Sequence, residues 1–544
     1  MSIVGRSIEI MREKKKKEDA VIDMELVNTT SSTNSQKAYV SGFRLAILLI
    51  GLVIVLFLAA LDRTIVATAL PQIASDYSAF NQISWVAISY LLTKTAFQPA
   101  YGKISDIFGR RSTFIFAICV FEFGSLLSAA APNIITLIIF RGVQGVGGGG
   151  IVSLVMIIIG DIVPLKDRAK YQGIFGAVYG MASLAGPVVG GTFTEHVTWR
   201  WCFYVNLPLG AITVAIITFM LHLPPRQGSL MDKIKRIDWC GSILLILGTI
   251  ALLLALSWGG DKYAWKDPII IGLLAGGVLL LILFLVVEAF VSIEPISPIH
   301  LFKNRSLLAC FGVNFFQGMA FFANIYYMPL YFQVVKGKSA SSSGFELMPY
   351  ILAVALGSII SCQIVSRTEK ITGKHLCVVG GLLVVVGAIL TSLLNANSNR
   401  VAQICYLIIS GFGVGLIMQT VFICSVLAVE EVDVSFVISI MIFFRSIGAV
   451  FGISIVGTIF KNALSKNVLT LGLNVPVDDL KNSAMFMHHL SDAQQHIVID
   501  AYVRSLQDAF HVLIPFGFLC FLCALAIKKT KRSSSECEVQ NFSL

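Results

Sequence analysis

The sequence predicts an all-α integral membrane protein with about fourteen transmembrane helices. Hydrophobic residues make up 56% of the 544 positions and charged residues only 13%, which is less charge than a soluble protein of this length needs to cover its surface. The apolar residues also gather into runs of about 20 residues, the length at which a helix crosses a bilayer. These two observations indicate a membrane protein rather than a soluble domain.

The predicted spans follow one another along almost the whole chain. They cover residues 45–69, 82–102, 112–130, 133–160, 171–191, 202–222, 239–258, 269–290, 306–333, 344–365, 375–394, 402–426, 436–458 and 509–527. An even number of spans returns the chain to its starting side, so both termini should share one face of the membrane. That face carries 27 of the 41 lysines and arginines, against 10 on the other, which places both termini in the cytoplasm.

The net charge of +10 therefore reflects topology, and we expect no nucleic-acid partner. The polar composition of residues 1–44 predicts a disordered cytoplasmic tail, whose KKKK run could also touch anionic lipid. Residues 528–544 are predicted to form a second cytoplasmic tail. The eleven cysteines are scattered and fall mostly within spans, which is typical of small packing residues.

The segment HHLSDAQQH, in a predicted external loop over 459–508, has a spacing seen in zinc sites, but nothing completes a ligand set. We expect no metal and no cofactor.

An internal repeat divides the chain into two halves. The first six spans match the last six at an offset near 266 residues, so that Gly145–Gly149 falls on Gly411–Gly415. Duplicated six-helix halves with a site between them are the architecture of many secondary transporters. The sequence therefore predicts two six-helix bundles, at 45–222 and 306–527, with two helices inserted at 223–305.

Seven motifs in order resemble those of one transporter family. The chain is similar to the major facilitator superfamily, specifically its fourteen-span drug:proton antiporter branch common in fungi. The motifs are LDRTIVATALP (61–71), GKISDIFGRR (102–111), IIFRGVQGVGGGG (138–150), GMASLAGPVVGG (180–191), WRWCFYVNLPLG (199–210), YYMPLYFQVVKGKSASSSG (326–344) and FFRSIGAVFG (443–452). The resemblance implies alternating access, in which the two bundles rock about a central cavity.

The motif GKISDIFGRR lies between the second and third predicted spans. Gly102 and Gly109 would permit tight turns, while Asp106 could cap the next element and pair with Arg110 or Arg111. The resemblance implies a conformational latch that holds the outward-facing state. An ordinary positively charged cytoplasmic loop is the alternative.

Glycines mark two other spans. The fourth contains Gly145, Gly147 and Gly150 in a G-x-G-x-x-G pattern, but the pattern lies inside a long apolar run, so we interpret it as a helix-packing face and not a dinucleotide site. The fifth span resembles the antiporter motif, which implies a bent helix packed tightly against the opposite half. The residues concerned are Gly180, Gly186, Pro187, Gly190 and Gly191.

Charged residues inside the spans are the best candidates for function, since each costs several kcal/mol unless it is paired or hydrated. Asp62 and Arg141 each lie about eight residues from the outer end of their spans, so a relation between them is feasible. The resemblance implies that Asp62 binds the coupling proton and that Arg141 helps its transfer; for Arg141 a purely structural ion pair is the alternative. Glu122 is a second intramembrane carboxylate, with a structural or a proton-coupling role.

The remaining polar candidates could line a substrate cavity. Lys94 departs from the family pattern, where a small polar residue is expected, and it could pair with an acid, bias the cavity against cations or extend toward the membrane surface. Arg445 matches its motif near the middle of a span. The others, which could equally be contacts between helices, are Asn314, Gln317, Asn324 and Tyr327.

These features lead to one expected function and three alternatives. We expect a monomeric, proton-driven exporter of amphipathic or cationic small molecules across the plasma membrane, with protons, cargo and lipid as its partners. A vacuolar carrier of basic amino acids has similar motifs and is the closest alternative. A non-transporting sensor is disfavoured by the latch motif, and an enzyme by the lack of any nucleophile or phosphate-loop motif.

Overall fold

The computed structural model describes residues 42–528 except 80–81, 164, 222–228, 261, 291–294, 296, 339, 368–371 and 471–491. The described residues form helices and contain no strand. The helices are α2 (Gly42–Asp76), α3 (Ser84–Phe108), α4 (Arg110–Ala129), α5 (Ile134–Ile162), α6 (Leu165–His196), α7 (Trp201–Tyr204), α8 (Asn206–Met220), α9 (Leu230–Lys235), α10 (Trp239–Trp258), α11 (Pro268–Phe290), α12 (Ile299–Phe302), α13 (Arg305–Leu330), η2 (Tyr331–Val335), α14 (Ala340–Glu346), α15 (Met348–Arg367), α16 (Gly373–Ser392), α17 (Arg400–Val426), η3 (Glu431–Asp433), α18 (Val434–Thr470), α20 (Asp492–His511) and α21 (Leu513–Ala526).

Twelve of these helices or helix pairs, counted over the described residues, are long and apolar enough to cross a membrane. Helices α3 and α6 are as long, with 25 and 32 residues, but are less apolar. In α3 this reflects Lys94 and its polar neighbours, and in α6 the glycines and a charged first turn. Together these helices account for the fourteen predicted spans and confirm the all-α membrane fold.

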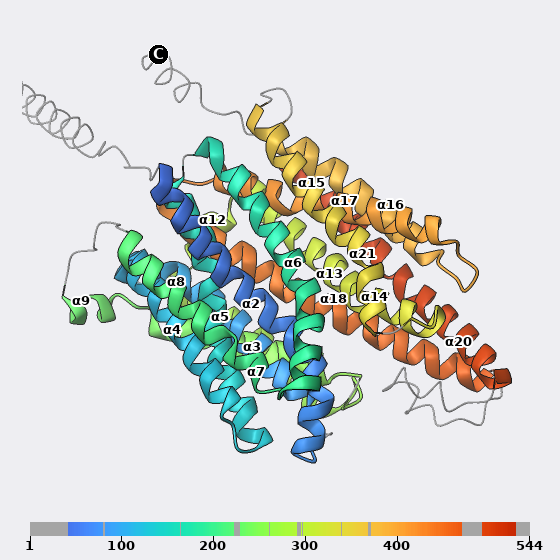
Figure 1. Cartoon of the computed structure of the whole chain (residues 1–544). Coiled ribbons are helices and arrows are strands. Elements are labelled where there is room, and N and C mark those ends of the chain that lie inside the picture. The colour runs from blue at the N-terminus through green and yellow to red at the C-terminus, as the bar shows by residue number, and fades with distance from the viewer. Residues whose placement is uncertain are drawn as a thin grey trace, which may run out of the picture. The chain divides into compact units, whose positions relative to one another are not determined.

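The same helix pairings occur twice along the chain. In the first half α2 packs on α6 and α8, and α5 packs on α3 and α4; in the second half α13 packs on α18 and α21, and α17 packs on α15 and α16. Figure 1 shows α15, α16 and α17 side by side. Across the halves, α3 meets α18 and α6 meets α15, while α10 and α11 pair with each other. The division into two six-helix bundles with an inserted pair remains our interpretation of this pattern.

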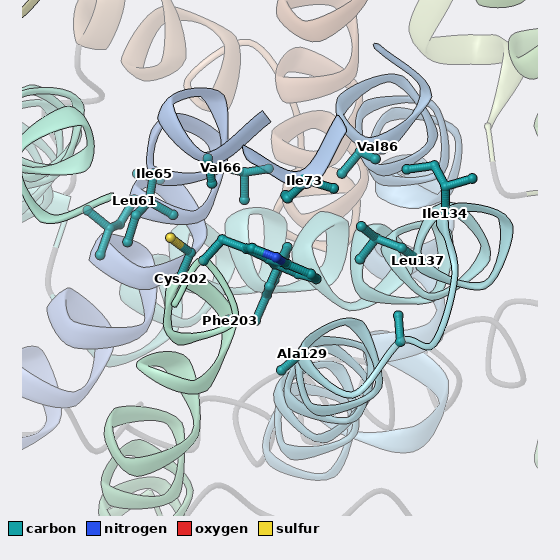
Figure 2. Packing of buried hydrophobic residues seen from close by; sticks show 14 of the residues in the cluster. Leu61, Ile65, Val66, Ile73, Val86, Ala129, Ile134, Leu137, Cys202 and Phe203 are labelled. Carbon is teal, nitrogen blue, oxygen red and sulfur yellow. The ribbon is translucent and has the colours of Figure 1, made fainter. Parts of the chain in front are cut away.

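A buried apolar cluster joins the helices of the first half near the chain reversals that precede α3 and α7. Ile73, Val86, Leu137 and Phe203 converge from α2, α3, α5 and α7 (Figure 2). Trp199 belongs to the same cluster, and its indole N–H donates to the Asp76 carboxylate at 2.8 Å. Large buried aromatic residues contribute much of the packing energy of such a cluster. The cluster thereby fixes the position of Phe203, which faces Arg141 of the candidate site described below.

Residues 102–108 continue α3 and do not form the predicted loop. The chain breaks only at Gly109, whose φ of +94° is a conformation that favours glycine, and α4 begins at the next residue. Gly102 lies against α18, where a Cβ would come within 2.7 Å of Ser439 Oγ. Its small size therefore permits helix contact, not a turn. Pro99 lies inside α3 between Lys94 and this contact.

The predicted external loop at 459–508 is also largely helical. Helix α18 extends to Thr470 and α20 begins at Asp492. The two helices pack through apolar side chains, including Phe460 and Tyr502, whose rings lie 5.8 Å apart. Burial of this amphipathic face explains the helices. Residues 471–491, which include His489 of the considered zinc pattern, lie outside the described residues, as do the two predicted tails apart from residues 42–44 and 528.

Candidate proton and substrate site

Asp62, Arg141 and Gln144 form a buried polar group between α2 and α5. Arg141 Nη1 donates to Asp62 Oδ2 at 2.7 Å, and Gln144 Nε2 donates to Asp62 Oδ1 at 2.9 Å. Arg141 Nη1 also donates to Gln144 Oε1 at 2.7 Å, and its Nε donates to the Val86 carbonyl at 3.1 Å. The three residues are at most 1% exposed. The sequence placed Asp62 and Arg141 at a similar depth in the membrane, and the structure shows that they are in contact. It also adds Gln144 to the group.

The arrangement balances two opposing effects on the carboxylate. Removal from water disfavours its charged form, while the two charge-assisted hydrogen bonds favour that form. The amide of Gln144 both donates and accepts, so it can remain bonded to Asp62 whether or not a proton is present. Gln144 could have been found in the sequence because it follows Arg141 by one helical turn.

Aromatic rings support the arginine from two sides. The Arg141 guanidinium carbon lies 4.3 Å from the ring centre of Tyr90 and 5.6 Å from that of Phe203. Cation–π contacts of this kind stabilise a desolvated cation by about 2 kcal/mol. They offset part of the cost of burying the guanidinium, and they connect it to the apolar cluster of Figure 2.

Lys94 lies one turn after Tyr90 on α3 and shares the same ring. Its Nζ is 3.5 Å from the Tyr90 hydroxyl and 5.2 Å from the ring centre, and the residue is 8% exposed. The charges that act on this ammonium are those of Arg63, Asp62, Arg141 and Arg445, in decreasing order. Within the described residues Lys94 makes no ion pair. The predicted pairing of Lys94 with an acid is therefore not seen in this structure.

The two other arginines come from different helices. The Arg63 guanidinium, on α2, lies 4.4 Å from the ring centre of Phe322 on α13. Arg445, on α18, is 7% exposed and lies 5.6 Å from the ring centre of Phe422 on α17. Because both arginines act on Lys94, helices of both halves contribute charge to one central region. We call Arg63, Lys94, Arg141 and Arg445 the central cations.

The other cavity candidates have different surroundings. The Asn314 amide donates to the Met441 carbonyl, and the Tyr327 hydroxyl donates to the Ile453 carbonyl at 3.2 Å. Both residues therefore connect α13 to α18. This matches the alternative that they are contacts between helices and do not line a cavity. Gln317 is fully buried, and neither its amide nitrogen nor its amide oxygen has a hydrogen-bond partner among the described residues. Asn324 is buried and its amide oxygen is likewise without a partner in that part of the chain.

Arg110 connects the two halves at the opposite end of α3. It donates to Asp106 at 2.7 Å, to Asp161 at the end of α5 at 2.8 Å, and to Ser105 at 2.6 Å. It also donates to the Ser435 hydroxyl in the first turn of α18. Arg110 is therefore the centre of the predicted latch, and we call this group the Arg110 network. Asp161 and Ser435 were not found from the sequence because they come from distant helices.

One detail of the predicted latch, the cap, is wrong, and of the two predicted partners of Asp106 the structure shows Arg110. Asp106 does not cap the next element but pairs with Arg110 within a helical turn of the chain. Arg111 does not pair with Asp106, and its guanidinium donates to the Thr218 carbonyl of α8 at 2.7 Å. The physical reason for both is that α3 continues to Phe108, which directs the two arginines to different neighbours.

Comparison with known protein families identifies the class of protein. The model of the Major Facilitator Superfamily matches residues 52–453, a range that includes the central cations and the Arg110 network. The chain belongs to the major facilitator superfamily. This major facilitator protein is therefore an integral membrane transporter.

Curated relatives point to the drug-efflux branch of the superfamily. The multidrug transporter protein MdtP of Bacillus subtilis is 38% identical over 80% of this chain and 79% of its own. The efflux pump aflT of Aspergillus parasiticus is 33% identical over 90% of this chain and 96% of its own. The vacuolar membrane amino acid uptake transporter fnx2 of Schizosaccharomyces pombe is 36% identical over 93% of this chain and 86% of its own.

Solved structures share the fold of this transporter. The human organic anion transporter MFSD10 superposes with a TM-score of 0.60 at 13% identity, covering 89% of this chain and all of that one. A bacterial homologue of the lysosomal transporter Spinster, in an inward-facing and occupied state, superposes with a TM-score of 0.56 at 15% identity over 91% of this chain. These similarities support the fold alone.

Glu122 of this transporter lies apart from the Asp62–Arg141 pair. It faces α8, where a Cβ on Gly210 would overlap its carboxyl group. The charge of Asp62 acts on it, but no contact joins them. Glu122 lines a crevice of about 400 Å³ with Cys119 and apolar residues of α8, and neither carboxyl oxygen has a hydrogen-bond partner among the described residues.

The glycines of α5 serve helix packing. A Cβ on Gly145 would overlap the Tyr90 carbonyl of α3, and one on Gly149 would come within 2.5 Å of the Lys94 carbonyl. On another face, a Cβ on Gly147 would overlap the backbone of α4. Since α5 is one continuous helix from Ile134 to Ile162 and its glycines touch neighbouring backbones, they leave no room for a phosphate group.

The glycines of α6 have two different partners. A Cβ on Gly180 would come within 2.5 Å of Ile351 on α15, whereas one on Gly186 or Gly190 would overlap Thr64 or Ile65 of α2. Gly191 has open space around it, and Pro187 lies within the same helix. The prediction that this motif packs on the opposite half thus holds for Gly180 only. Gly186 and Gly190 pack within their own half.

We expect Arg110→Ala to slow transport by about tenfold while the protein inserts at normal abundance. A tenfold change corresponds to about 1.4 kcal/mol between two conformations, which is reasonable for loss of four partly buried polar contacts. Asp106→Ala should have a smaller effect because it removes only one of them. The measurement is the initial transport rate in reconstituted vesicles, with abundance taken from the same membranes.

Arg111→Ala is the matched control for that experiment. It removes the same side chain from the same helical turn, but its bond to Thr218 stays within the first half. Equal loss of rate in Arg110→Ala and Arg111→Ala would show that bonding between the halves is not what limits the cycle.

Proposed function

We propose that this transporter is a proton-coupled exporter of amphipathic small molecules that works by alternating access. The observation that carries the proposal is the buried Asp62–Arg141 pair with its shared partner Gln144. An intramembrane ionisable pair between two helices is a common place for proton transfer in transporters. The efflux direction is supported by the names of relatives such as MdtP and aflT, which cover most of this chain.

A proton on Asp62 would change the contact between α2 and α5. The proton occupies a carboxylate oxygen, so the carboxyl group loses its charge and its strong attraction for Arg141 weakens. Gln144 can keep its hydrogen bonds to both side chains during this change. The contact therefore has two arrangements that differ by one proton, which is what coupling to a proton gradient requires.

The Arg110 network supplies the second element of the cycle. It lies at the end of α3 that the lysine and arginine distribution assigns to the cytoplasm, and it ties α3 to α18 of the other half. A transporter with this contact in place is closed on that side. We propose that loading of cargo from the cytoplasm requires the network to break, and that it re-forms when the opposite side opens.

Export across the plasma membrane is the function that we favour, with both termini in the cytoplasm and one chain as the working unit. Vacuolar amino acid uptake is a second candidate, because fnx2 is 36% identical over 93% of this chain. The central cations argue against a basic amino acid as cargo, since their charge opposes a cationic side chain. The charge of the central cations likewise opposes a cationic drug, so it speaks against the cationic cargo that we expected from the sequence.

A transport assay in vesicles tests the proposal. Purified protein would be reconstituted into liposomes with an acidic lumen, and uptake of matched anionic, neutral and cationic fluorescent amphiphiles would be followed. We expect accumulation of at least one of them that requires the pH gradient and collapses on addition of a protonophore. Accumulation that is unchanged by the protonophore would contradict proton coupling, and a complete lack of transport would favour a sensor.

A further inference from the structure

We propose that the cargo of this transporter is an organic anion, and that Lys94 binds its carboxylate or other acidic group. The inference rests on the proposed function because it concerns the substrate at the same central site. It goes further by assigning the charge of the substrate and the residue that recognises it.

The surroundings of Lys94 provide the first argument. The residue is only 8% exposed, its nearest polar contact is a neutral hydroxyl at 3.5 Å, and it makes no ion pair with any described residue. A buried ammonium without an anion costs several kcal/mol in a membrane. The face of Tyr90, 5.2 Å away, offsets only part of that cost. An anionic ligand would satisfy the remainder.

The balance of charge around Lys94 provides the second argument. Arg63, Arg141 and Arg445 all act on its ammonium with the same sign, and Asp62 is the one carboxylate among the described residues that opposes them. Asp62 is already bonded to Arg141 and Gln144. The field of the region is therefore positive, and it attracts an anion and repels a cation.

The aromatic rings near these cations suit an amphipathic molecule. Phe322 lies beside Arg63 and Phe422 beside Arg445, on α13 and α17 of the second half. Ring faces bind the apolar body of a ligand, while a cation fixes its acidic group. Gln317 on α13 adds an amide without a partner among the described residues. A compound with one acidic group on an aromatic body matches this combination.

The proposal fixes the sign of the interaction between cargo and Asp62. An anion at Lys94 and the Asp62 carboxylate repel each other, so neutralising Asp62 should strengthen the binding of an anion. The same change should weaken the binding of a cation. Proton and anion thus do not compete for one carboxylate. Exchange of the proton for the anion then requires that the halves reorient with either one bound but not with both, so coupling depends on reorientation and not on competition for binding.

Equilibrium binding to the full-length protein in phosphatidylcholine nanodiscs tests the proposal without any proton gradient. The probes are pyrenebutyrate and pyrenebutylammonium, which share one aromatic body and differ in the sign of their charge. Binding is measured as the fluorescence change above that of empty discs. The variants are Lys94→Gln, Lys94→Arg and Asp62→Asn, with Lys303→Gln as a control that removes an exposed lysine outside the central region.

We expect pyrenebutyrate to bind more tightly than pyrenebutylammonium. Its Kd should rise about tenfold in Lys94→Gln, which corresponds to about 1.4 kcal/mol, and return to within about threefold of the native value in Lys94→Arg. It should fall in Asp62→Asn and stay unchanged in Lys303→Gln. Because no gradient is imposed, this pattern can hold even if proton coupling fails in vesicles.

Three results would overturn the assignment. Tighter binding of the ammonium probe would make the site cation-selective. An unchanged Kd for pyrenebutyrate in a folded Lys94→Gln protein would remove Lys94 from the site. Weaker anion binding in Asp62→Asn, a variant that leaves Lys94 in place, would contradict the predicted repulsion.

Discussion

Asp62→Asn is expected to abolish accumulation of substrate driven by a pH gradient, while substrate binding remains measurable. Asparagine has nearly the same shape as aspartate and can still bond to Gln144, but it carries no titratable proton. The fully buried position of Asp62 and its 2.7 Å contact with Arg141 make it the centre of the proposed proton step. The measurement is substrate accumulation in vesicles under an imposed pH gradient, with downhill exchange as the control.

The partner residue allows a stricter version of this test. Arg141→Ala leaves a buried carboxylate without its counter-ion, a change that typically costs about 3–5 kcal/mol, so both coupling and stability should suffer. The double variant with Asp62→Asn should be less damaged than the sum of the two single changes, because the two side chains interact directly. If Asp62→Asn accumulates substrate as well as the native protein, the proton is carried elsewhere, and Glu122 becomes the next candidate.

Gly145→Ala is expected to eliminate transport although it adds a single methyl group. The new Cβ would overlap the Tyr90 carbonyl and Thr93 hydroxyl of α3, and backbone atoms cannot yield as a flexible side chain can. Helix α3 would have to move away from α5, and with it Tyr90, which supports both Arg141 and Lys94. The measurement combines the transport rate with the thermal stability of the purified protein.

Gly142→Ala is a closely matched control for this change. It lies one turn earlier on the same helix, and its Cβ would meet nothing nearer than a Thr93 methyl at 3.8 Å. Both substitutions raise helix propensity by about 1 kcal/mol, so that effect cancels in the comparison. We expect native activity in Gly142→Ala. Similar behaviour of the two variants would show that contact with α3 is not what the glycine at 145 provides.

The sequence predicted well those features that depend on distance along a helix. The depths of Asp62 and Arg141 follow from counting residues to the ends of their spans, and the structure places the two in contact. The glycines of α5 were correctly interpreted because their apolar flanks exclude a phosphate-binding loop. Lys94 was identified as unusual from its residue type alone.

Features that depend on which helices meet were predicted less well. Gly102 was expected in a turn, but it remains helical because α18 packs against it. Gly186 was expected to face the opposite half, but it packs on α2. The arginines that surround Lys94 come from α2, α5 and α18, and their convergence depends on tertiary packing. The spacing of hydrophobic residues and the composition of a span determine how deep a residue lies and on which face of its helix. They do not determine which residues of other helices it contacts.

Helix α3 has a mechanical consequence for the transport cycle. It carries Lys94 at one level and its contact with α18 at Gly102, about 12 Å further along at 1.5 Å per residue. Pro99, between them, cannot donate its backbone hydrogen bond, and Gly109 forms a one-residue joint to α4. Helix α3 therefore lacks one backbone hydrogen bond between Lys94 and Gly102, which makes that turn the easiest place for it to bend. If α3 bends there during the proposed cycle, the region around Lys94 and the Arg110 network need not move as one rigid body.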